Sequence, residues 1–83
     1  MSTHEIHDLI FQKGIFTFND GHQNTGMIVA RYNIVQARIE YYLIPESNII
    51  AYQAARSKFD SNTHRELGTM VDIEHIVNAK LAA

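Results

Sequence analysis

The stretch V-Q-A-R-I-E-Y-Y-L, residues 35–43, decides the fold that we expect of this chain. Its side chains alternate in character, with apolar residues at the odd positions and polar residues at the first even ones. The odd set is Val35, Ala37, Ile39, Tyr41 and Leu43, and the even set is Gln36, Arg38 and Glu40. Because successive side chains of a strand point to opposite faces, this alternation predicts one strand with a core face and a more polar face.

The segment before it predicts a second strand, which pairs with the first as a hairpin. It covers residues 24–32, with T-G-M-I-V-A-R-Y in its body, and the N-I that follows turns the chain. If the turn holds an even number of residues, Ile28 and Ala30 share the core face of residues 35–43. Gly26 inside this strand indicates a bulge, a sharp bend or a close approach of another backbone segment.

Another strand, I-F-T-F-N at residues 15–19, comes before a hairpin turn at Asp20 and Gly21. Its aromatic and β-branched content favours a strand, and Asp-Gly tolerates the positive φ angles of a tight turn. A loop of only those two residues would place Phe16 and Phe18 on the polar face. A longer loop or a bulge, a helix over that face, or a strongly bent sheet closing on itself would each remove the conflict.

Residues 2–13 predict an N-terminal helix. Ser2 and Glu5 have the spacing of a capping box, in which each side chain accepts a hydrogen bond from the other's backbone N–H. Three apolar residues then share one helical face: Ile6, Leu9 and Ile10. Gly14 suits the position just beyond the helix end.

The second half of the chain has a more mixed pattern after Pro45, which cannot donate to a sheet and so ends the long strand. Residues 48–59 favour a helix with Ser47 as its N-cap, although a strand over the same residues stays open. The helical face would carry Ile49, Tyr52, Ala55 and Phe59. Residues 57–66 are polar and predict a loop, and residues 67–71 predict a short strand.

A last helix is predicted from Asp72 as its N-cap, with an apolar face made of Ile73, Ile76, Val77 and Leu81. Together these elements describe one α+β domain over residues 1–83. We expect a small, strongly bent antiparallel sheet of three to five strands, with an N-terminal and a C-terminal helix.

The composition limits the possible functions. The 83 residues carry a net charge of −2 at a pI near 6.2, which excludes a broadly basic nucleic-acid binder and leaves room for a local basic patch. Without cysteine, the chain has no disulfide, thiolate chemistry or cysteine-based zinc site. Its apolar runs are too short to span a membrane, and its N-terminus lacks a signal-peptide pattern, so we expect a cytoplasmic protein without a membrane partner.

The stretch F-N-D-G-H-Q-N-T-G-M-I-V-A-R-Y-N, residues 18–33, resembles the first motif of the Sm-like proteins in its Asp20, Gly21 and Gly26. The resemblance implies a small barrel of the SH3-like or Sm-like kind that assembles into a ring and binds single-stranded RNA. Tyr32 would then stack on a base and Asn33 would read a base edge. The second motif of that family is missing from G-T-M-V-D-I-E-H-I, and a barrel of another SH3-like lineage explains the same residues.

Catalytic and metal-binding patterns are not evident. The chain shows no nucleophile elbow, no glycine-rich phosphate loop and no paired carboxylates, so we do not expect an enzyme or a cofactor. His4 and His7 lie three residues apart on the predicted helix, but a metal site needs three or four ligands, so we expect no metal site.

Arginines and tyrosines on one sheet face are the remaining candidates for binding, because aromatic and guanidinium groups stack on bases and anchor protein partners. The candidate residues are Arg31, Tyr32, Asn33, Arg38 and Tyr42. Tyr42 and Ile44 interrupt the polar face and predict an exposed apolar spot that needs a helix or a partner to cover it. We therefore expect a non-enzymatic protein-interaction module that self-associates into a homo-oligomer. The sequence does not identify any further protein partner. The alternative is an Sm-like binder of single-stranded RNA that uses Arg31, Tyr32 and Asn33.

Overall fold

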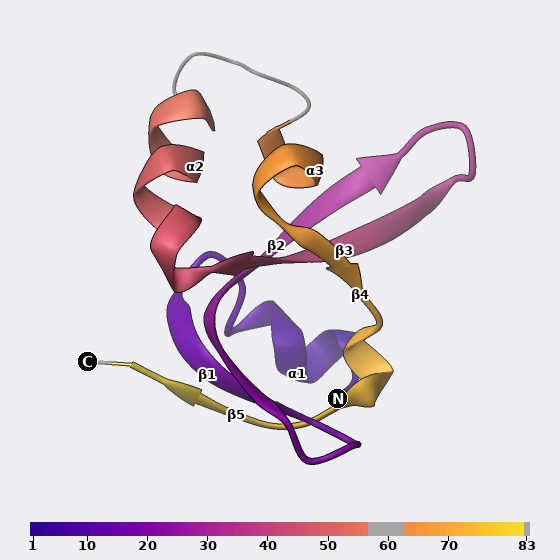
Figure 1. The fold of residues 1–83 in the computed structure, drawn as a ribbon. Coiled ribbons are helices and arrows are strands. Elements are labelled where there is room, and N and C mark those ends of the chain that lie inside the picture. The colour runs from indigo at the N-terminus through magenta and orange to yellow at the C-terminus, as the bar shows by residue number, and fades with distance from the viewer. Residues whose placement is uncertain (57–62, 83) are drawn as a thin grey trace.

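The computed structural model describes residues 1–56 and 63–82 of the chain and shows an α+β fold with one antiparallel sheet (Figure 1). The helices are α1 (Thr3–His7), α2 (Ile49–Arg56) and α3 (Thr63–Leu67), with 3-10 turns η1 (Glu46–Asn48) and η2 (Ile73–His75). The strands are β1 (Lys13–Phe18), β2 (Gln23–Asn33), β3 (Arg38–Pro45), β4 (Thr69–Val71) and β5 (Ile76–Leu81). The predicted fold class is confirmed at this level.

The sheet has the order β4-β3-β2-β1-β5 and is open, with β4 and β5 at its two edges. In a flat sheet these edges would lie about 19 Å apart, at about 4.8 Å per neighbouring pair. Residues 72–75 alone join β4 to β5, and three of them form the tight turn η2, which rises only about 2 Å per residue. The sheet therefore curls until its two edges approach each other.

The turn between β1 and β2 explains how the phenylalanines reach the core face. Phe18 N–H donates to the carbonyl of His22 at 2.9 Å, so the loop holds three residues, and Gly21 takes a φ of +92°. This three-residue loop is longer than Asp20-Gly21 alone and shifts the register, so that Phe16 pairs with Asn24. Phe16 consequently lies on the same face as Ile28, and the longer-loop alternative is confirmed.

The turn between β2 and β3 contains residues 34–37, an even number, so the expected shared face is confirmed, although Asn33, which we expected in the turn, is the last residue of β2. Ala30 pairs with Tyr41 and Ile28 with Leu43, so these residues share a face. The strand that we expected from residue 35 starts only at Arg38, however, and Val35 is 94% exposed. The prediction that residues 35 and 37 belong to the core face is wrong, because they lie in the turn.

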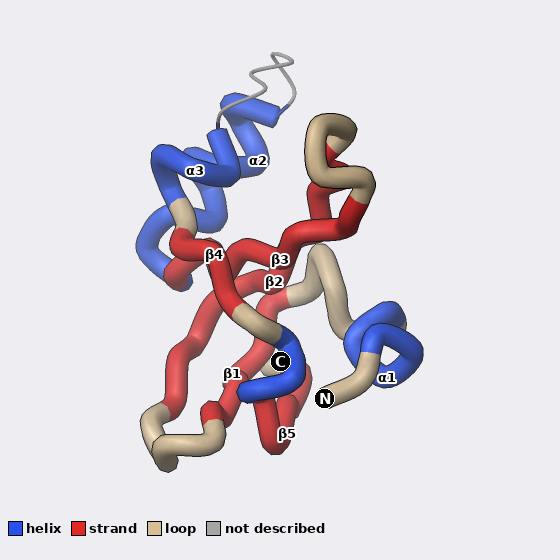
Figure 2. The backbone as a smooth tube through the Cα atoms, turned by 90° about the vertical axis from the view of Figure 1, so that its right-hand side faces the viewer, coloured by secondary structure: helices blue, strands red, loops and turns tan. Residues whose placement is uncertain are grey.

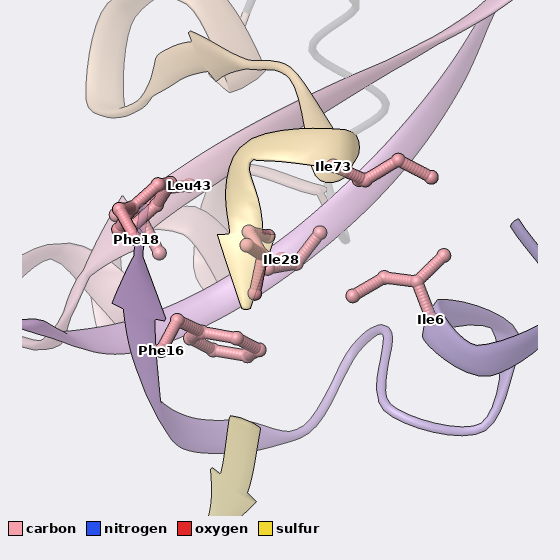
Figure 3. Packing of buried hydrophobic residues seen from close by; sticks show 7 residues of the cluster. Ile6, Phe16, Phe18, Ile28, Leu43 and Ile73 are labelled. Atoms are coloured by element: carbon pink, nitrogen blue, oxygen red, sulfur yellow. The ribbon is translucent and has the colours of Figure 1, made fainter. Parts of the chain in front are cut away.

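The two faces of the sheet each pack into a hydrophobic cluster. Figure 3 shows the first cluster, where side chains of α1, the sheet and η2 meet. Its buried members are Ile6, Phe16, Phe18, Ile28, Leu43, Ile73 and Ile76. The second lies on the opposite face and is made of Met27, Val29, Tyr42, Ile44 and Tyr52. In Figure 2, α1 and the α2–α3 pair accordingly lie on different sides of the strands.

A close backbone contact at Gly26 keeps β2 against the end of β3. A Cβ atom at this position would clash with the carbonyl oxygen of Ile44, which lies in the paired strand. Of the three interpretations that the sequence left open for Gly26, the close approach is therefore confirmed.

The C-terminal helix that we predicted is wrong. Asp72 does act as a cap, since its Oδ1 accepts the backbone N–H of Glu74 at 2.9 Å, but only the single turn η2 follows. The chain then continues as β5, which pairs antiparallel with β1. A helix would leave the outer backbone groups of β1 without sheet partners, and this edge decides the conformation of residues 76–81.

The other helices differ from the expectation in length and place. The Ser2–Glu5 capping box is confirmed, but α1 ends at His7, and Gly14 lies inside β1. The helix favoured over residues 48–59 is confirmed for α2, with Tyr52 buried; residues 57–59 lie outside the described part of the chain. The predicted loop over residues 57–66 is wrong at its end, where α3 begins at Thr63, and its first part is also outside the described residues.

Candidate functional site

The β2–β3 hairpin projects beyond the rest of the molecule, and Figure 1 shows its turn pointing away from η2 and from the N-terminus. The backbone N–H of Gln36 donates to Oδ1 of Asn33 at 3.1 Å, which holds the turn against the end of β2. Ala37 takes a φ of +52°, and Asn33 pairs with Arg38 where the turn closes. The candidate residues of the sequence all lie on or near this hairpin.

Glu40 is a buried carboxylate at the centre of one face of the hairpin. Nδ2 of Asn33 donates to its Oε2 at 3.2 Å, and the hydroxyl of Tyr42 donates to its Oε1 at 3.1 Å. The guanidinium of Arg38 lies 3.5 Å from the same Oε2. The hydrogen bond from Asn33, then those from Tyr42 and Arg38, lower the pKa of Glu40 although burial opposes them. The ionised carboxylate thereby ties the two strands together.

Three of the five candidate binding residues thus meet at Glu40, namely Asn33, Arg38 and Tyr42. Tyr42 is also buried, and the ring of His64 from α3 meets it edge-on with centroids 4.6 Å apart. Ile44 is fully buried in the same cluster. Of the two covers that the sequence left open for Tyr42 and Ile44, a helix or a partner, the helices α2 and α3 provide the first, so this spot is not exposed and does not support a partner contact.

The other two candidates, Arg31 and Tyr32, are exposed and lie on opposite faces of β2. Arg31 is directly opposite Glu40, and Tyr32 is opposite Ile39. Since neighbouring residues of a strand alternate, Tyr32 and Asn33 also point to different faces. The structure does not bring Tyr32 together with the polar residues around Glu40.

The end of the hairpin carries exposed apolar side chains that the sequence reasoning missed. Ile34 is 83% exposed and Val35 is 94% exposed, both in the turn. Tyr32 and Ile39 are exposed beside them and form a cross-strand pair. We call these four residues the hairpin tip. Two consecutive aliphatic residues in a turn, where Gly, Asn, Asp or Ser are usual, were the signal that could have identified it.

A pocket of about 640 Å³ opens at the base of the hairpin, between β3, β4, η2 and the N-terminal residues. Its apolar lining is Met1, Ile39, Tyr41, Met70, Val71 and Ile73. Asp72, the N-cap of η2, and Glu74 within η2 add carboxylates, and both are exposed. The N-terminal ammonium of Met1 donates to the carbonyls of Ile73 at 2.9 Å and Ile76 at 2.6 Å, so it holds one wall of the pocket in place.

The part of the chain that the structure describes shows neither a group of metal ligands nor a membrane-spanning helix. No three of its histidine, aspartate and glutamate side chains gather closely enough to hold a metal ion. Within the same residues, no helix has the length and apolar character needed to cross a membrane. The candidate site is the surface made of the hairpin tip, with its exposed apolar residues, and the pocket beside it.

Comparisons of the chain with protein-family models, with curated proteins and with solved structures found no match.

Proposed function

We propose that this protein is a non-enzymatic interaction module that self-associates through its hairpin tip. The observation that carries the proposal is the exposure of Ile34 and Val35, at 83% and 94%. Together with Tyr32 and Ile39 they place four large apolar side chains at the end of one projecting element. Clustered apolar surface of this kind is typical of protein contacts, whereas single exposed residues need no explanation.

The hairpin also presents this surface at little entropic cost. The turn is held by the Asn33–Gln36 hydrogen bond, and the strands behind it are tied by the bonds to Glu40. A partner therefore gains the burial of the tip, about 25 cal/mol for each Å² of apolar area, without first having to order a loop.

The architecture of a small barrel of the SH3-like or Sm-like kind is part of the same proposal. The strand order β4-β3-β2-β1-β5 and the four-residue connection between the two edge strands support it, because they describe a short sheet curled toward closure.

The alternative, single-stranded RNA binding by an Sm-like protein, has less geometric support. A base pocket made of Tyr32 and Asn33 would need both side chains on one side, and they point to opposite faces of β2. The amide of Asn33 is also engaged with Glu40. Arg31 and Tyr32 are nevertheless exposed and accessible to RNA, and the experiment below distinguishes this alternative from self-association.

The test is the solution mass of the protein over a range of concentrations, by size-exclusion chromatography with light scattering. We expect a mass above the 9.5 kDa of one chain that rises with concentration. The double variant Ile34→Ser/Val35→Ser should remain at the mass of one chain. Ile50→Ser is the matched control, because Ile50 is 82% exposed on α2 and is not part of the tip.

A wild-type protein that stays monomeric at every concentration would contradict the proposal. The measurement is repeated with a short uridine-rich RNA at low salt. A salt-sensitive shift that Tyr32→Ala weakens would favour the RNA-binding alternative instead.

A further inference from the structure

We propose that the outer end of the hairpin tip of one copy, Ile34 and Val35, inserts into the pocket of a second copy, so that self-association is a head-to-tail contact between two different surfaces. This inference rests on the proposed self-association and specifies its partner surface. Three features of the described structure support it: the shape of the two surfaces, their chemistry and their charge.

The shapes match as a projection and a recess. The tip is a narrow two-stranded end that carries Ile34 and Val35, the two most exposed large apolar residues among those described. The pocket, at about 640 Å³, lies in the size range of sites that enclose a small ligand or a few side chains. In both Figure 1 and Figure 2 the tip points away from η2, so a copy does not fill its own pocket.

The pocket offers apolar surface that the fold leaves open. Met70 is half exposed and Ile39 is 52% exposed, and both line the pocket. Tyr41 and Val71 form a cross-strand pair on the core face that Ile39 shares, whereas Met70 pairs with Tyr42 on the opposite face and lines the pocket from the edge strand β4. The core face therefore continues past the buried cluster to residues that remain exposed to solvent. An aliphatic side chain from a partner that packs there would extend the hydrophobic core.

The charges of the two surfaces are complementary. Residues 31–37 include Arg31 and contain no aspartate or glutamate. The pocket carries the exposed carboxylates of Asp72, the N-cap of η2, and of Glu74 within η2, beside the carboxylate of Glu40, which Asn33, Tyr42 and Arg38 engage. Its own cationic groups are engaged: the ammonium of Met1 with two backbone carbonyls, and Arg38 with Glu40. Arg31 forms no ion pair within the described residues, so it is the group that a partner's η2 would attract.

A contact between two different surfaces has a consequence for assembly. Ile39 belongs to the tip and also lines the pocket, but Ile34 and Val35 lie outside the pocket lining. A copy that inserts these two residues therefore still offers its pocket to the next copy. Association then continues into a ring or an open chain, whereas a tip-to-tip contact would stop at a dimer.

The experiment mixes two variants that each lack one surface. The tip variant is Ile34→Ser/Val35→Ser, and the pocket variant is Met70→Arg/Glu74→Arg. Both pocket positions are exposed, and Asp72 is left unchanged because it caps η2. Circular dichroism and thermal unfolding first establish that both variants are folded.

We expect each variant alone to be monomeric, and an equimolar mixture to form a dimer of about twice 9.5 kDa, without larger species. In that dimer the intact tip of the pocket variant occupies the intact pocket of the tip variant. A pocket variant that self-associates like the wild type, or a mixture that stays monomeric, overturns the head-to-tail contact. The first of these outcomes leaves the proposed function standing, and a monomeric wild type would remove both.

Single charge reversals test the proposed attraction between Arg31 of one copy and the carboxylates beside η2 of the next. Glu74→Arg alone should weaken self-association about two- to fivefold, the effect of one exposed ion pair. Arg31→Glu in the same chain should restore it, because the reversed charges attract each other again in the next copy. Failure of the second change to restore association, with both variants folded, would overturn the pairing of Arg31 with η2.

Discussion

At the scale of single residues, Glu40 shows how one side chain can be placed in the correct strand and still be misread. The alternation of residues 35–43 put it on the polar face, and in the structure it lies directly opposite Arg31. It is nonetheless buried, with hydrogen bonds from Asn33 and Tyr42. A buried carboxylate is tolerated only when donors surround it, and the hairpin supplies them from both strands.

The contribution of Glu40 to stability should depend on pH. Its pKa is lowered in the folded protein, first by the hydrogen bond from Asn33. The contribution is therefore fully present above its unfolded pKa, about 4.3, and is lost as the pH falls through the lowered folded value. Glu40→Gln should lower the melting temperature at neutral pH, and the difference from the wild type should shrink in acid.

Thermal unfolding of both proteins by circular dichroism, from neutral pH down to about one pH unit below that unfolded value, measures this effect. The carboxylates of Glu5 and Asp20, whose pKa values are also lowered, are present in both proteins and cancel in the comparison. A difference in melting temperature that stays constant over the whole pH range would show that the negative charge of Glu40 does not contribute to stability.

At the scale of elements, the C-terminal segment is a case in which a long-range strand pairing overrides the local sequence pattern. Ile73, Ile76 and Val77 have helical spacing, and the sequence favoured a helix on that basis. In the structure the same segment is β5, because its backbone completes the outer edge of β1. The pairing partner lies some sixty residues earlier in the chain, and nothing in a local pattern reports it.

A pair of alanine substitutions tests this assignment. In the predicted helix Ile76 and Val77 would both be buried, but in β5 Ile76 is fully buried and Val77 is 61% exposed. Ile76→Ala should therefore cost about 2–5 kcal/mol of unfolding free energy, through lost burial and the cavity left behind. Val77→Ala should change it by no more than about 0.5 kcal/mol.

Chemical denaturation of the two variants beside the wild type gives both values. Equal losses at the two positions would support a helix and contradict the strand.

At the scale of the whole molecule, a chain of 83 residues has a small core and a thin margin of stability. Self-association then contributes to stability by mass action, since an assembly that binds only folded copies draws the equilibrium away from unfolded chains. The melting temperature of the wild type should consequently rise with protein concentration.

The double variant Ile34→Ser/Val35→Ser should lose this dependence while keeping its fold, because both residues are exposed in the turn. Scanning calorimetry over a hundredfold range of concentration compares the two proteins. A concentration-independent melting temperature in the wild type would argue against association of the folded chain.

Local features of the sequence determined several parts of this protein by themselves. They include the capping box of α1, the end of β3 at Pro45 and the shared face of Ile28 with Leu43. Each depends on neighbouring residues or on the parity of one turn, so it can be recognised without knowing the rest of the fold.

The tertiary structure alone decided which surfaces are covered. The alternation of side chains predicts that Tyr42 and Glu40 share a face, but not that α2 and α3 bury it. On the opposite, core face, no helix of the described residues covers the end of the sheet near Ile39, which is exposed. The strand conformation of residues 76–81 depends likewise on the free edge of β1. Burial and edge pairing are set by segments far away in the chain, and for that physical reason the hairpin tip replaced Tyr42 as the candidate site.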